Sequence, residues 1–67
     1  KTSNLVKGLK KAGFHAIRQK GSHVWFKHED GRVTTVPVHS DQDVGRGLFR
    51  KILRDIDMNF DEFIKYL

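Results

Sequence analysis

The sequence contains no cysteine and one proline, and it has no long apolar run. Without cysteine, the chain forms neither a disulfide framework nor a thiolate metal site. No stretch approaches the roughly 18 apolar residues of a membrane-spanning helix, and no secretory signal peptide is visible. These absences predict a cytoplasmic protein. The 67 residues suffice for one small domain with one compact core.

Positive charge is unevenly distributed along the chain. Residues 1–54 carry 12 Lys and Arg against four Asp and Glu, whereas residues 55–67 carry one lysine against four acidic residues. A basic body attracts polyphosphates, acidic proteins or anionic membranes. For a domain this small, the charge favours nucleic acid as the partner over a role in solubility alone.

The hydrophobic pattern predicts an α+β fold. The expected elements are a helix over 4–12, strands over 14–20, 23–28 and 33–38, a helix over 48–56 and a short helix over roughly 60–66. Ser3 or Asn4 is expected to cap the first helix, and Asn59 with Glu62 forms a capping-box pattern for the last. Because short turns join the strands, we expect a three-stranded antiparallel meander with helices on one face.

Alternation along the middle strand predicts which side chains share its open face. His23, Trp25 and Lys27 lie on one side, and Val24 and Phe26 on the other. A two-residue turn at Gly21-Ser22 would add Arg18 and Lys20 to the side of His23 and place Ile17 in the core.

The second hairpin sets the register of the third strand. A two-residue loop at Asp30-Gly31 pairs Lys27 with Thr34 and Trp25 with Val36. This register has a weakness, because it puts Val36 and Val38 on the open face. A bulge or a three-residue turn would reverse that parity.

The triplet Gly21-Ser22-His23 indicates chemistry on an RNA backbone. A histidine suits removal of the 2′-hydroxyl proton, after which the oxygen attacks the adjacent phosphate. Cations stabilise the charged transition state. His23 is the candidate catalytic residue, and the candidate RNA- and phosphate-binding residues are Arg18, Lys20, Gly21, Ser22 and Lys27. The alternative is that His23 is a surface polar residue that follows a turn.

Other polar and aromatic residues are weaker candidates. His39 is either a second proton carrier or a loop cap. Trp25 either stacks on a base or is covered by a partner protein or a helix, and the pattern favours such a cover. His15 is expected to be exposed, and His28 to be partly buried and hydrogen-bonded. Since no standard metal-ligand spacing is present, we expect no metal, and a chain of this size leaves no room for a large cofactor pocket.

Several motifs together resemble the HicA toxin family. They are Ala12-Gly13-Phe14, the run Arg18-Gln19-Lys20-Gly21-Ser22-His23, Phe26, Asp30-Gly31-Arg32, Thr35-Val36-Pro37-Val38-His39 and the segment Gly47 to Leu53. The resemblance covers nearly the whole chain. It departs from the family before the second helix, where Arg46-Gly47-Leu48-Phe49 stands in place of the common Pro-Gly-Thr-Leu, and at 55–59.

The resemblance implies one domain over 1–67 with the α-β-β-β-α order of double-stranded-RNA-binding domains. It implies a metal-independent endoribonuclease that cleaves messenger RNA and halts growth, with His23 as the catalytic residue. It also implies a HicB-type antitoxin that occludes the site, and no membrane partner. Two alternatives stay open: a non-catalytic RNA-binding module, and a protein-interaction domain whose basic face meets only an acidic partner.

Overall fold

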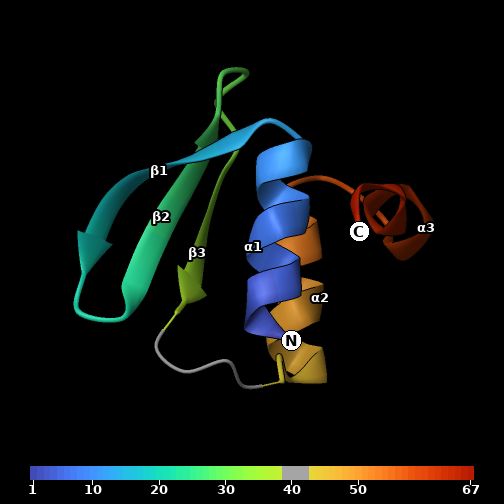
Figure 1. Cartoon of the computed structure of the whole chain (residues 1–67). Helices are drawn as coiled ribbons and strands as arrows, with labels where there is room; N and C mark the ends of the chain where they lie inside the picture. The colour runs from blue at the N-terminus through green and yellow to red at the C-terminus, as the bar shows by residue number, and fades with distance from the viewer. Residues whose placement is uncertain (39–42) are drawn as a thin grey trace.

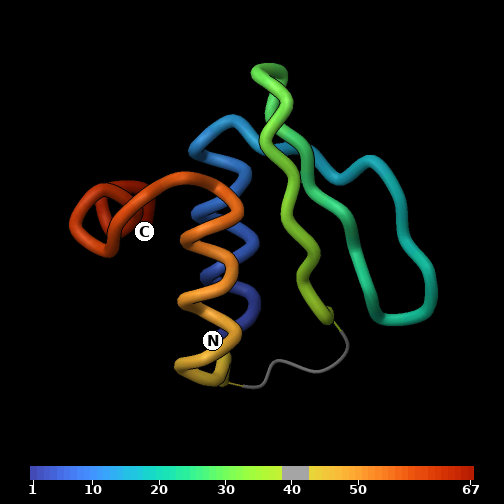
Figure 2. The backbone as a smooth tube through the Cα atoms, turned by 180° about the vertical axis from the view of Figure 1, so that it is seen from behind, coloured from blue at the N-terminus to red at the C-terminus, as the bar shows by residue number. Residues whose placement is uncertain are grey.

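The computed structural model describes residues 1–38 and 43–67. The elements are α1 (Thr2–Lys11), β1 (Phe14–Lys20), β2 (His23–His28), β3 (Val33–Pro37), α2 (Arg46–Asp55), α3 (Phe60–Phe63) and the 3₁₀ helix η1 (Ile64–Tyr66). The strands form an antiparallel sheet in the order β1-β2-β3. Helices α1 and α2 lie side by side on one face of this sheet (Figures 1 and 2). The predicted α+β class and α-β-β-β-α order are therefore confirmed.

The core lies between the sheet and the two long helices. Its buried apolar residues are Leu5, Leu9, Phe14, Val24, Phe26, Val36, Ile52, Ile56 and Phe63. Along β2, Val24 and Phe26 are buried while His23 and Lys27 are exposed. This alternation confirms the parity predicted for the middle strand, and it turns His23 away from the helices.

The hairpin loop that joins His28 to its partner Arg32 contains three residues, 29–31, rather than the two that Asp30-Gly31 predicts. The His28 N–H donates to the Arg32 carbonyl at 2.9 Å, and Gly31 adopts a φ of 103° that suits a three-residue hairpin loop. Lys27 consequently pairs with Val33 and Trp25 with Thr35, so the predicted pairing with Thr34 and Val36 is wrong. The extra residue reverses the parity of β3 and places Val36, fully buried, opposite Val24 in the core.

A β-bulge at Ile17 determines the two faces of β1. The register shifts between Ala16 and Arg18, and Ile17 is 57% exposed, so its predicted place in the core is wrong. The bulge allows Phe14 to be fully buried while Arg18 and Lys20 point to the opposite side. The pairing of Lys20 with His23 and of Arg18 with Trp25 confirms the expected two-residue turn and the shared face.

The helix ends follow the sequence signals only in part. Helix α1 begins at Thr2 after Lys1 and has no side-chain cap, so the predicted caps Ser3 and Asn4 are wrong. At α3 the predicted capping box is present: the Asn59 N–H donates to the Glu62 carboxylate at 2.9 Å, and the Glu62 N–H donates to the Asn59 side-chain oxygen at 2.8 Å.

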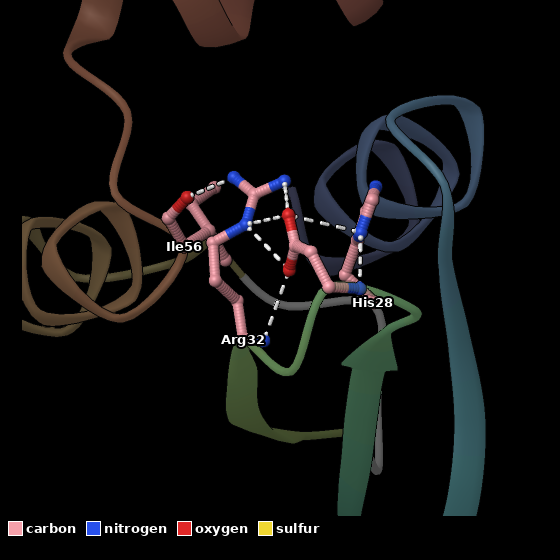
Figure 3. A network of polar contacts seen from close by, with 4 residues as sticks. His28, Arg32 and Ile56 are labelled. Carbon is pink, nitrogen blue, oxygen red and sulfur yellow. Dashed lines mark hydrogen bonds and ion pairs between the residues drawn. The ribbon is translucent and has the colours of Figure 1, made fainter.

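A polar network ties the β2–β3 hairpin to the end of α2 (Figure 3). The Arg32 guanidinium binds both carboxylate oxygens of Asp30 and donates to the Ile56 carbonyl. The His28 Nδ1 atom accepts a hydrogen bond from the Asp30 N–H at 3.1 Å, and the His28 ring packs edge-on against Phe14. The prediction that His28 is partly buried and hydrogen-bonded is confirmed, and this network assigns it to holding the fold together.

Removing the Asp30 carboxylate should lower stability only where that group is ionised. Its hydrogen bonds from Arg32 hold the pKa of the Asp30 carboxyl below its usual value. The stabilisation is therefore fully present above the unfolded-state pKa and is lost as the pH falls through the folded-state pKa. We expect Asp30→Asn to melt below wild type at neutral pH and to converge with it in acid. Glu29 is an exposed neighbour in the same loop, and Glu29→Gln should have the melting temperature of wild type. If the melting temperatures of Asp30→Asn and wild type differed equally at neutral and acidic pH, this account would be contradicted.

Candidate functional site

The face of the sheet that turns away from α1 and α2 carries the candidate residues. None of the elements in the described ranges lies over this side of the sheet (Figures 1 and 2). Three cross-strand rows lie on it: His15, Lys27 and Val33; Arg18, Trp25 and Thr35; Lys20, His23 and Pro37. We call Arg18, Lys20, His23, Trp25 and Lys27 the basic face.

The turn between β1 and β2 fixes the position of His23. Gly21 has a φ of 58°, which suits glycine at the first central position of a tight hairpin turn. The Gln19 side-chain amide donates to the Gly21 carbonyl at 3.1 Å, and the Val38 N–H donates to the Ser22 carbonyl. Hydrogen bonds from Gln19 and from Val38 thus hold the two carbonyls of the turn. His23 follows the turn as the first residue of β2, and its side chain is exposed.

Lys20 is the cation nearest to His23 in the strand pairing. The two residues are direct cross-strand partners on the same face, a position that separates Cβ atoms by about 5 Å. The ammonium group of a lysine in this position reaches an anion bound against the imidazole. An exposed imidazole and a mobile cation can therefore contact the same phosphate group.

Arg18 and Trp25 form the second row of the basic face. The Arg18 guanidinium lies 5.0 Å from the centre of the Trp25 ring, which is within the range of a cation–π contact. Trp25 is half-buried, and its other cross-strand neighbour is Thr35. Lys20 and Arg18, which the sequence placed beside His23, therefore lie in the His23 row and in the row next to it, and Arg18 contacts an aromatic ring.

Lys27 lies at the far end of the same face. It is four residues from His23 along β2, or about 13 Å for an extended strand. Lys27 is therefore too distant to share one phosphate with His23 and suits a neighbouring phosphate of a longer ligand. His39, the candidate second proton carrier, lies outside the described residues.

Two polar residues of this face, Thr35 and His15, were not expected there from the sequence. Thr35 is on the open face. Thr34 is buried on the other side of the sheet, and its hydroxyl donates to the Asp55 carboxylate at 3.0 Å. His15 shares the face with His23 but pairs with Lys27 at the other end. A correct loop length at Asp30-Gly31 would have placed Thr35 on the open face, because that length alone sets which residues of β3 lie on each face.

The chemistry available on the basic face is proton transfer and anion binding. Within residues 1–38 and 43–67, no three or more His, Asp or Glu side chains group as ligands for a metal ion. In the same ranges, no helix combines the length and apolar character needed to cross a membrane. An imidazole both accepts and donates protons, and the neighbouring cations attract phosphate.

Comparison with known proteins identifies one family. The family model described as "HicA toxin of bacterial toxin-antitoxin" matches residues 2–58 of the 67-residue chain. The match includes α1, the whole sheet with the Gly21-Ser22-His23 turn, and α2, and it stops before α3. No curated protein matches the chain. The family match agrees with the resemblance that the sequence motifs indicate.

Proposed function

Because the chain belongs to the HicA toxin family of bacterial toxin–antitoxin systems, we propose that it is a metal-independent endoribonuclease that cleaves messenger RNA in the cytoplasm and halts growth. The observation that carries the proposal is the exposed His23 imidazole on an open sheet face, with Lys20 as its cross-strand partner. The proposal treats residues 1–67 as one catalytic domain.

The His23 imidazole would carry both proton transfers. As the base, it takes the proton from a ribose 2′-hydroxyl, and that oxygen attacks the adjacent phosphorus. The protonated ring then gives the proton to the departing 5′ oxygen as the P–O bond breaks. The products are a 2′,3′-cyclic phosphate on one fragment and a 5′-hydroxyl on the other, so protons and electron pairs balance without a further reactant.

The residues around His23 would bind the substrate and stabilise the transition state. Lys20, the cross-strand partner of His23, would neutralise the charge that develops on the attacked phosphate. Gly21 and Ser22 position the imidazole through the bonded turn. Arg18 and Lys27 extend the positive charge along the sheet, so the bound strand contacts the face at more than one point.

The family implies an antitoxin partner, and we propose a HicB-type protein that covers the basic face. An acidic surface on that partner would compete with RNA for the same cations. Occlusion of His23 alone would suffice to stop cleavage, because the proposed reaction passes both protons through this exposed imidazole.

Purified protein should cut labelled single-stranded RNA in the presence of EDTA. Chelation leaves the reaction intact, because His23 and Lys20 supply the base and the cation. Gel analysis of the products gives the result directly. Tight, salt-sensitive binding of RNA that stays intact would instead support the non-catalytic RNA-binding module. Absence of RNA binding would support a domain that contacts only proteins.

A further inference from the structure

The Arg18 guanidinium lies over the Trp25 ring across β1 and β2, in the row next to His23. The guanidinium carbon is 5.0 Å from the indole centre, and the two residues are direct cross-strand partners. Trp25 is the single tryptophan of the chain and is half-buried on the open face. A guanidinium held in this way presents a planar, weakly hydrated surface together with the aromatic ring.

The Arg18–Trp25 pair lies in the row next to His23, the proposed site of bond cleavage. Trp25 is two residues from His23 on the same face of β2, or about 7 Å along an extended strand. A single strand whose phosphate contacts His23 and Lys20 therefore passes over the neighbouring row. Thr35, on the other side of Trp25, adds a hydroxyl that both donates and accepts hydrogen bonds.

We propose that Arg18 and Trp25 are the stacking subsite for one unpaired base of the RNA strand whose phosphate lies at His23. The inference rests on the proposed function and adds a substrate class to it: RNA that is single-stranded at the cleaved position. Unpaired bases stack on aromatic side chains and on arginine planes, whereas a base inside a duplex is already stacked on its neighbours. Arg18 therefore contributes its planar shape as well as its charge.

The surroundings of Trp25 favour a base over an apolar protein surface. Its cross-strand neighbours on this face are Arg18 and Thr35, and the next residues on the same side of β2 are His23 and Lys27. The four nearest positions along β2 and directly across from Trp25 are thus polar or cationic, while the apolar Val33 and Pro37 lie diagonally across from it on β3. This combination matches the bases and phosphates of a nucleic acid.

Trp25 fluorescence provides the test, because the chain has no other tryptophan. The protein is used with His23→Ala, so that the RNA stays intact. A short single-stranded oligoribonucleotide should quench the emission, whereas the same strand paired with its complement, or inorganic tripolyphosphate, should not. Equal quenching by tripolyphosphate would overturn the proposal, because it would show an electrostatic effect without base contact.

Three further variants in the same background separate stacking from charge. Trp25→Leu should weaken binding of the single strand by roughly 5- to 150-fold, the usual range for one stacked base, and Trp25→Phe should recover most of that loss. Arg18→Lys keeps the charge and removes the plane; it should lose nearly as much affinity as Arg18→Ala. Retention of full affinity by Arg18→Lys would assign Arg18 to phosphate binding and overturn the stacking role.

Circular dichroism and melting temperature show whether each variant is folded. If Trp25→Leu binds RNA normally but no longer binds the antitoxin, the ring belongs to a protein interface and the subsite is refuted. These binding measurements do not depend on cleavage. If wild-type protein fails to cut RNA while stacking is observed, the proposed nuclease function fails and the base subsite stands.

Discussion

His23→Ala should abolish RNA cleavage and growth arrest while leaving the fold intact. The side chain is exposed and lies outside the apolar core, so its removal leaves no cavity. A general acid–base residue contributes about 10²- to 10⁴-fold to a reaction rate, and loss of both proton transfers should reach the upper part of that range. Cleavage of a labelled single-stranded RNA by purified protein, at matched concentration, gives the measurement.

His15→Ala is the matched control for this variant. His15 is a second exposed histidine on the same sheet face, but it pairs with Lys27 at the end of the sheet distant from His23. We expect this variant to cleave RNA at close to the wild-type rate. If His23→Ala also kept full activity at matched expression and stability, the catalytic role of His23 would be refuted.

Phe26→Ala should unfold the domain and remove all activity for a different reason. Phe26 is 2% exposed in the core, and truncating a buried phenylalanine costs about 3–5 kcal/mol. A domain of this size has a total stability on the order of 3–10 kcal/mol. The variant should therefore lose the cooperative thermal transition that circular dichroism records for wild type.

Lys27→Ala is the control for Phe26→Ala, because Lys27 is the next residue of β2 on the exposed face. It should melt as wild type does. A cooperative melt of Phe26→Ala at the wild-type temperature would contradict the assignment of this ring to the core. Together His23→Ala and Phe26→Ala separate loss of chemistry from loss of structure on opposite faces of β2.

The orientation of His23 could be predicted because β2 alternates without interruption. Buried Val24 and Phe26 turn His23, Trp25 and Lys27 to the other side, whatever the neighbouring strands do. Arg18 and Lys20 were also placed correctly, because their register counts from the adjacent two-residue turn. The errors within the sheet arise where one extra residue is inserted into the pairing of two strands.

Two such insertions account for the residues that sequence reasoning misplaced. Ile17 forms a bulge, and nothing in the local sequence distinguishes it from a core residue. The loop after His28 has one residue more than Asp30-Gly31 suggests, which exchanges the faces of Thr34 and Thr35. The contact between Arg18 and Trp25 was not predicted either, because it depends on side-chain conformation as well as on register.

The chemical ends of the RNA fragments test the central claim most directly. If His23 activates the ribose 2′-hydroxyl, products formed in EDTA carry a 2′,3′-cyclic phosphate and a 5′-hydroxyl, and none form with His23→Ala. Fragments that instead carry a 3′-hydroxyl and a 5′-phosphate would show that water attacks the phosphorus. That result would contradict the role proposed for the imidazole on the basic face.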